Sequence, residues 1–150
     1  MKPIYNKQAN FDYEILDKFE AGLMLTGAET KSAKAGQINL KGSYVTLKHQ
    51  PKIEVFLINA NISKYQPAGP QPDYEPTKAR KLLLHKKEIS KITGIIQQKG
   101  LTLVPLRVYT KHNRVKLEFG IGRGKKKFEK KKAIKERDSK RQVDRAMKQY

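Results

Sequence analysis

The chain has 150 residues, which suits one compact domain with a tail, and its 37% hydrophobic content is compatible with a buried core. It carries 33 Lys and Arg against 14 Asp and Glu, a formal charge of +19, which indicates nucleic acid or an anionic membrane surface as partner. The sequence has no cysteine, no secretory leader and no run near ~20 apolar residues, which excludes disulfides and thiolate sites and predicts a cytoplasmic protein that does not span a membrane. Of the two partner classes, we expect nucleic acid and no membrane.

The first third of the chain predicts strands around one short helix. In FDYEILDKF, the alternating residues Phe11, Tyr13 and Ile15 share one face, and AGLMLTG continues the apolar pattern. AETKSAKAG, which ends at Gly36, predicts a helix of one or two turns. SYVTL and IEVFLIN then flank KHQP, an arrangement typical of a β-hairpin.

The middle of the chain predicts a loop and a longer helix. SKYQPAGPQPDYEPT contains four prolines and predicts an extended surface loop. From about Lys78 to Lys99 apolar residues recur at helical spacing, and Gly100 supplies a stop. Successive helical residues point ~100° apart, so the three leucines at 82–84 overfill one helical face. Either one leucine faces outward, or a break near His85 lets all three be buried.

A second hairpin is predicted where LTLVPLRVY and RVKLEFGI flank TKHN. Pro105 cannot donate to a strand ladder, so it requires an edge position or a bulge. Together these elements favour a mainly β fold with α: an OB-type antiparallel β-barrel of about six strands with about three helices, over residues 1–122. A basic C-terminal tail follows at 123–150.

The sequence offers little for catalysis. His49, His85 and His112 are far apart, and no Ser/His/Asp set or metal-ligand spacing occurs. In GIGRG at 120–124, Gly124 and Lys125 are followed by lysine rather than Ser or Thr, so we interpret this segment as a flexible exit from the barrel. We therefore predict no enzyme, no metal and no cofactor.

Six blocks of sequence resemble one known family. They are NKQANFDYEI at 6–15, EAGLMLTGAETKSAKAG at 20–36, LKGSYV at 40–45, KARKLLLHKKEI at 78–89, KGLTLVPLRVY at 99–109 and GRGKKKFEKKKAIKERD at 122–138. In this order they resemble the SsrA-binding protein family, also called small protein B, over nearly the whole chain.

The resemblance implies a non-enzymatic RNA-binding factor with an OB-type barrel. Such a factor binds the tRNA-like domain of transfer-messenger RNA and helps deliver it to stalled ribosomes for trans-translation. Elongation factor Tu takes part indirectly, through the charged RNA, and the tail enters the vacant messenger channel among ribosomal RNA. A basic OB-fold ribosomal protein is the alternative, and an RNA-acting enzyme is a third class.

The resemblance also implies specific RNA-binding positions. They are Asn6, Glu20 and Leu83, together with the basic-glycine block Gly124, Lys125 and Lys126. Lys7, Lys31, Lys34, Arg80 and Lys81 are expected to contact phosphates, although each can equally be a solvated charge. Asn6 can instead cap a turn. Glu20 can hold neighbouring cations in register, accept hydrogen bonds from base amino groups, or be a plain strand-end charge.

The tail carries 13 Lys and Arg against 4 Asp and Glu from Arg123 onward, a net charge of +9. Like charges repel, so we expect it to be disordered alone and to become helical on the ribosome. Phe128 stands where the family commonly has histidine and keeps a flat face for stacking. The residues expected at the ribosome's decoding centre are Phe128, Lys130, Lys131, Lys135, Arg137, Lys140 and Arg141.

Overall fold

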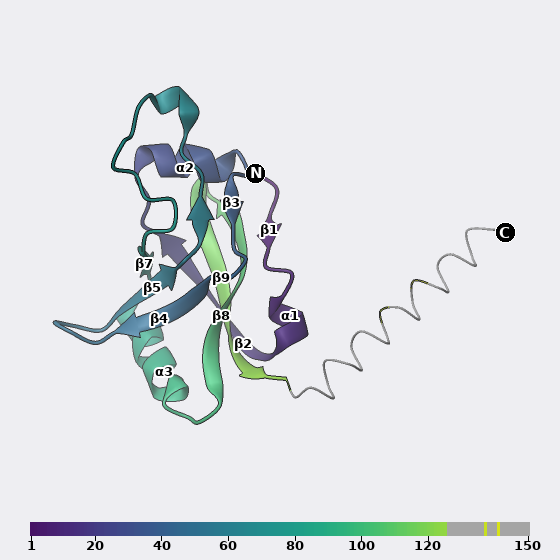
Figure 1. Ribbon diagram of the computed structural model, residues 1–150. Helices are drawn as coiled ribbons and strands as arrows, with labels where there is room; N and C mark the ends of the chain where they lie inside the picture. Colours follow the sequence, from purple (N-terminus) through teal and green to yellow (C-terminus); the bar gives the residue numbers. More distant parts are fainter. Residues whose placement is uncertain (126–136, 138–140, 142–150) are drawn as a thin grey trace.

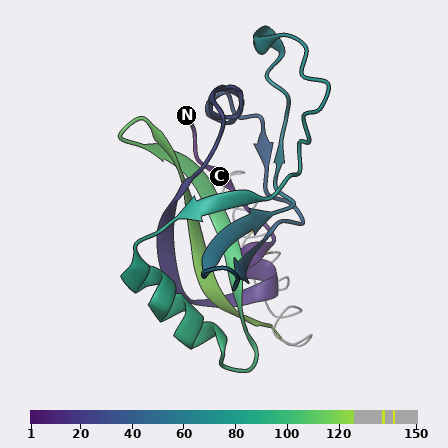
Figure 2. The same cartoon turned by 90° about the vertical axis from the view of Figure 1, so that its left-hand side faces the viewer.

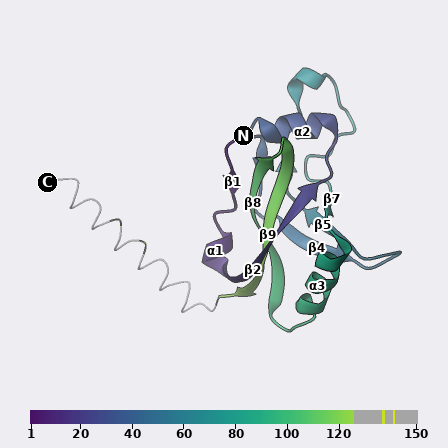
Figure 3. The ribbon, with the colours of Figure 1, turned by 180° about the vertical axis from the view of Figure 1, so that it is seen from behind.

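The computed structural model describes residues 1–125, 137 and 141, and the fold within them is mainly antiparallel β (Figure 1). The strands are β1 Ile4–Tyr5, β2 Tyr13–Leu23, β3 Ile38–Asn39, β4 Tyr44–Lys48, β5 Glu54–Ile58, β6 Asn61–Ile62, β7 Arg80–Leu83, β8 Leu101–Lys111 and β9 Arg114–Gly124. The helices are α1 Ala9–Asp12, α2 Gly27–Lys34 and α3 Lys86–Ile96, with a 3₁₀ turn at Gln66–Ala68. Figures 1 and 3 show α2 and α3 at opposite ends of the strands.

Seven strands form one sheet in the order β1-β8-β9-β2-β7-β5-β4, and β3 pairs with β6 in a small second sheet. Figure 2 shows how strongly the large sheet curves. β4 comes close to β8, but no ladder joins them within the described residues. The mainly β architecture with three α-helices is as predicted, whereas the closed OB-type barrel is not confirmed.

Both predicted hairpins are present, as β4–β5 and β8–β9. The second turns through His112 and Asn113, whose φ angles of 51° and 63° match the left-handed conformation that a two-residue hairpin turn requires. The register of β8 against β9 shifts between Pro105 and Arg107, which confirms the bulge expected at proline. Local turn chemistry and the missing N–H of proline therefore set this half of the sheet.

The core is filled by the inward residues of β2 and β9. Val115, Leu117, Phe119 and Ile121 are all buried, as their alternation predicts, and the ring of Phe119 stacks on Phe19 at 5.7 Å between centroids. Fully burying a side chain of this size contributes about 1.5–3 kcal/mol. Four such neighbours on one strand anchor β9 in the core, where it lies between β8 and β2.

The interpretation of residues 120–124 as a flexible exit is wrong, because this segment is the end of β9 and pairs with both β2 and β8. A Cβ atom on Gly120 would lie 2.8 Å from Cγ2 of Ile15, and one on Gly122 would lie 3.1 Å from Cγ2 of Val104. Because these glycines lack side chains, β2 and β8 can pack closely against this end of β9. β9 also continues two residues beyond the predicted end of the body at 122.

The helix expected from Lys78 to Lys99 is partly wrong, because its first part is the strand β7 and the helix begins only at Lys86. The backbone N–H of His85 donates to Oε1 of Glu88 at 3.1 Å, which marks the start of α3. A break near His85 is therefore present, but it does not bury all three leucines. Leu82 is buried, Leu84 half-buried and Leu83 exposed, since neighbouring residues of a strand point to opposite faces.

Candidate nucleic-acid interface

The strands β1, β8, β9, β2 and β7 present one continuous face away from the core, here called the outer sheet face (Figure 3). Because Tyr5 pairs with Arg107, Arg107 with Glu118, and Glu118 with Glu20, the side chains of all four lie on this same face. The outer sheet face comprises Tyr5, Lys18, Glu20, Leu83, Arg107, Tyr109, Lys111, Lys116 and Glu118. Tyr5 and Glu118, which lie more than 100 residues apart in the chain, are thus on the same face.

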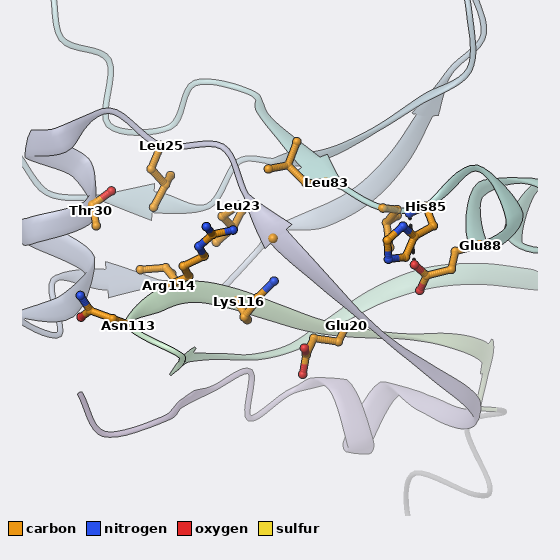
Figure 4. A pocket seen from close by; sticks show the side chains of 13 residues that line it. Glu20, Leu23, Leu25, Thr30, Leu83, His85, Glu88, Asn113, Arg114 and Lys116 are labelled. Carbon is orange, nitrogen blue, oxygen red and sulfur yellow. Dashed lines mark hydrogen bonds between the residues drawn. The ribbon is translucent and has the colours of Figure 1, made fainter.

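A cleft of about 740 Å³ hollows one end of this face, between β2, β7, β9 and the starts of α2 and α3. Figure 4 shows Leu25 and Leu83 along one side, with Arg114 and Lys116 along the other. Gly22 forms the floor: a Cβ there would lie 3.4 Å from Cβ of Leu83 and 3.7 Å from Nζ of Lys116. The missing side chain thus lets an apolar wall and an ammonium group face the same space.

A second cleft of about 360 Å³ lies at the other end of the face, where β1 meets β8. It is lined by Tyr5, Asn6, Lys7, Asn10, Lys18, Leu106, Arg107 and Glu118. Glu118 in this cleft is the cross-strand neighbour of Glu20 in the first cleft. The two clefts are therefore parts of one surface, and they contain the predicted residues Asn6, Lys7, Glu20 and Leu83.

Glu20 is held by two neighbours on β8. The hydroxyl of Tyr109 donates to its Oε2, and Nζ of Lys111 donates to its Oε1 at 3.4 Å. The Tyr109 hydrogen bond is the main cause that lowers the pKa of Glu20, with a smaller contribution from Lys111. Burial and the Glu20 hydrogen bond raise the pKa of Tyr109. Glu20 therefore orients a phenol and an ammonium group, in agreement with its interpretation as a holder of neighbouring cations.

Asn6 fastens the strand end β1 to the bulge in β8. Its backbone N–H donates to the carbonyl of Leu106 at 2.8 Å, and its Nδ2 donates to the carbonyl of Pro105 at 2.9 Å. Only the NH₂ end of the amide can donate to a carbonyl, so this bond fixes the amide orientation. The acceptor Oδ1 is then the atom left for a further partner.

Three other predicted lysines contact groups of the protein. Nζ of Lys34 donates to Oδ1 of Asn113 at 2.9 Å, at the rim of the large cleft. Lys31 lies over the ring of Tyr65, 5.8 Å from its centroid, and Lys81 lies 3.7 Å from a carboxylate oxygen of Glu54. These are surface contacts worth at most about 1 kcal/mol, so the ammonium groups can exchange them for phosphate.

Unlike these lysines, Arg80 is buried, and the prediction that it contacts a phosphate is wrong. Its side chain is only 1% exposed and its Nε donates to Oε2 of Glu29 at 2.7 Å. The remaining guanidinium N–H groups donate to the carbonyls of Ala60 and Pro76, at 2.7 and 2.9 Å, and to the hydroxyl of Tyr74. Alternation in β7 turns Arg80 and Leu82 inward, and the buried carboxylate compensates the charge. Arg80 therefore ties the long loop before β7 to α2.

Glu29 is buried beside this guanidinium. Burial by itself raises the pKa of its carboxyl group, but hydrogen bonds from Thr26, Arg80 and Lys78 outweigh this effect, so the pKa lies below its ordinary value of 4.5. The carboxylate is thus charged at neutral pH and balances Arg80.

Comparison with known proteins assigns the chain to a family. The family model described as SmpB protein matches residues 3–149. The chain belongs to the SmpB family. It is 46% identical over 144 residues to the SsrA-binding protein of Thermosynechococcus vestitus, covering 96% of this chain and 93% of the relative. It is 48% identical over 145 residues to the SsrA-binding protein of Trichormus variabilis, covering 97% and 92%.

A solved structure described as "tmRNA-SmpB: a journey to the center of the bacterial ribosome" has a similar fold. Its TM-score is 0.67 at 40% sequence identity, and the match covers 85% of this chain and 87% of that chain. The membership predicted from the six blocks is therefore confirmed for the SmpB family.

The basic block after β9 is only partly described. Gly124 is exposed and pairs with Tyr13, and Nζ of Lys125 donates to the carbonyl of Asn10 at 2.6 Å, next to the second cleft. Lys126, Phe128, Lys130, Lys131, Lys135 and Lys140 lie outside the described residues. Arg137 and Arg141 are described, and both are exposed.

Seven residues of the outer sheet face were not predicted from the sequence, namely Tyr5, Lys18, Arg107, Tyr109, Lys111, Lys116 and Glu118. For β9 the pattern could have indicated them: if Val115 and Leu117 are buried, then Lys116 must face outward. No sequence pattern indicated Tyr5, because β1 has only two residues and Arg107, the partner of Tyr5, lies 102 positions away in the chain.

No helix of the described part of the chain is long and apolar enough to cross a membrane. In residues 1–125, 137 and 141, no group of three His, Cys, Asp or Glu residues is placed to hold a metal ion.

Proposed function

We propose that the protein binds the tRNA-like domain of transfer-messenger RNA and helps deliver it to stalled ribosomes for trans-translation. The observation that carries this function is the outer sheet face with its two clefts, which are lined by Asn6, Lys7, Glu20 and Leu83 in a chain of the SmpB family. The solved relative, whose description names tmRNA and the bacterial ribosome, supports the choice of partners.

The chemistry of the face suits structured RNA with unpaired bases. Lys7, Lys18 and Lys116 supply cations for phosphates, and this contribution weakens as salt rises. Leu83 supplies an apolar surface on which a base or ribose can pack. Oδ1 of Asn6 supplies an acceptor for a base amino group or a 2′-hydroxyl. In this proposal the protein binds and positions RNA and carries out no chemical step.

The tail acts after capture. Its net charge of +9 suits a channel walled by ribosomal RNA phosphates, and Phe128 offers a ring for stacking. We place Lys130, Lys131, Lys135, Arg137, Lys140 and Arg141 in this role. Elongation factor Tu contributes through the charged RNA rather than through the protein, in the cytoplasm.

The function is tested by capturing cellular RNA with the full-length protein and sequencing what is retained. One dominant structured RNA with a tRNA-like domain is expected. Ribosomes should contain the protein in substoichiometric amounts, with enrichment on messages that lack a stop codon. Stoichiometric association with every ribosomal subunit would instead indicate a ribosomal protein.

The division between body and tail is tested by ending the chain at Gly124. The shortened protein should bind transfer-messenger RNA nearly as well as the full chain but should fail to support peptide tagging on ribosomes stalled without a stop codon. Replacing Lys130, Lys131 and Lys135 with alanine should act in the same direction. Tagging by the shortened protein at a near wild-type rate would show that the tail is dispensable.

A further inference from the structure

Three flat side chains lie in a row across β1 and β8 on the outer sheet face. Tyr5 is the cross-strand neighbour of Arg107, and Cζ of Arg107 lies 4.4 Å from the ring centroid of Tyr109. Directly opposed residues of antiparallel strands have Cβ atoms about 4.5–5.5 Å apart, so Tyr5 and Arg107 are within contact range. A phenol, a guanidinium and a second phenol thus form one strip, here called the stacking strip.

The strip is held in place from one side and open on the other. Nη2 of Arg107 donates to Oε2 of Glu118 at 3.1 Å, and the hydroxyl of Tyr109 is taken up by Glu20. Tyr5 has no such anchor in the described residues, and 61% of its surface is exposed. An aromatic ring this exposed, beside a fixed guanidinium, is a surface onto which another flat group can stack.

Two lysines that have no carboxylate partner among the described residues lie in the cleft beside the strip. Lys7 and Lys18 line the 360 Å³ cleft with Tyr5 and Arg107, and neither forms an ion pair with another described residue. Lys111 and Lys81, by contrast, have carboxylate partners. Ammonium groups that share a cleft with a flat strip fit a nucleotide, whose base stacks while its neighbouring phosphates bind the cations.

We propose that the stacking strip receives one unpaired base of the bound RNA on the ring of Tyr5, with the flanking phosphates held by Lys7 and Lys18. The proposal rests on the proposed RNA-binding function and adds a site and a mode of contact to it. A protein segment would fit less well, because the cleft wall is mostly polar and the free charges are positive.

The chain contains no tryptophan, so Tyr5→Trp creates a single fluorescent reporter at the strip. We would titrate this full-length variant with a transcript of the tRNA-like domain of transfer-messenger RNA. Stacking on a base should quench the indole emission in step with binding. Tyr44→Trp is the control, since Tyr44 is similarly exposed at 52% but lies on β4, outside the cleft that Tyr5 lines with Lys7 and Lys18. Its emission should change little.

Affinity gives the second readout. Tyr5→Phe keeps the ring and should bind the transcript within about twofold of wild type, whereas Tyr5→Ala should bind about tenfold or more weakly. Arg107→Lys, which keeps the charge but loses the plane, should also weaken binding several-fold. Thermal melting of each variant checks that the fold is retained.

The outcomes distinguish a failure of the stacking site from a failure of RNA binding as a whole. If wild type binds the transcript but Tyr5→Trp emission stays constant and Tyr5→Ala binds normally, the stacking strip is not a base site and the proposed function stands. If wild type itself does not bind the transcript, both the proposed function and this inference are overturned.

Discussion

Leu82 and Leu83 are chain neighbours with opposite surroundings, and this makes them a matched pair for testing the interface. Leu82 is 2% exposed within the core, while Leu83 is 49% exposed at the edge of the large cleft. We predict that Leu82→Ala changes stability and that Leu83→Ala changes RNA affinity. The same substitution one residue apart thus gives two different results.

The magnitudes follow from burial. Leu82→Ala removes core side-chain atoms and leaves a cavity, so it should cost about 2–5 kcal/mol of unfolding free energy. Burying a whole leucine contributes about 1.5–3 kcal/mol, so truncating Leu83, which is exposed over about half of its surface, should cost roughly 1 kcal/mol. The exposed half of Leu83, if RNA covers it, is worth about the same again, which corresponds to roughly three- to tenfold in affinity.

The assay combines urea denaturation of both variants with binding to the tRNA-like domain at one fixed salt concentration. Binding should be measured at a temperature where Leu82→Ala is fully folded, so that its affinity reports the surface alone. Equal destabilisation by Leu83→Ala and Leu82→Ala would contradict the surface position of Leu83. Wild-type RNA affinity of Leu83→Ala would show that RNA does not cover this side chain.

Other predictions concern the buried ion pair and the glycines. Arg80→Leu leaves the Glu29 carboxylate buried without its main partner and should lower the unfolding free energy by about 3–5 kcal/mol, measured in urea. Because folding lowers the pKa of Glu29, the charged carboxylate contributes its full stabilisation above pH 4.5, the ordinary pKa of glutamate. This stabilisation is lost as the pH falls through the lower pKa of the folded protein. In unfolding free energies measured against pH, Glu29→Gln should therefore lose less stability in acid than the wild type. Gly94→Ala should stabilise the protein by about 0.5–1 kcal/mol, since Gly94 lies within α3 and a Cβ there meets no atom within 4 Å. Gly120→Ala should instead lower the melting temperature, because its Cβ would lie 2.9 Å from a backbone oxygen of β2, and an unchanged melting temperature would contradict the close crossing of β2 and β9.

Near neighbours in the chain specify several features of this protein without help from the rest of the fold. The turn at His112 and Asn113, the bulge at Pro105 and the capped helix α2 all arise from residues a few positions apart, whose backbone preferences act locally. The alternation of β9 determines which of its side chains enter the core. The basic charge and the six family blocks are likewise properties of the sequence alone, and they lead to the family.

Other features depend on residues far apart in the chain, and only tertiary contacts set them. A run of four residues is too short to distinguish a strand from the first turn of a helix, and β7 is a strand because β2 and β5 pair with it. Arg80 is buried rather than exposed because Glu29, 51 positions away, supplies a carboxylate inside the fold. Tyr5 meets Arg107 for the same kind of reason: strand pairing across about 100 residues sets the register, and no local pattern encodes it.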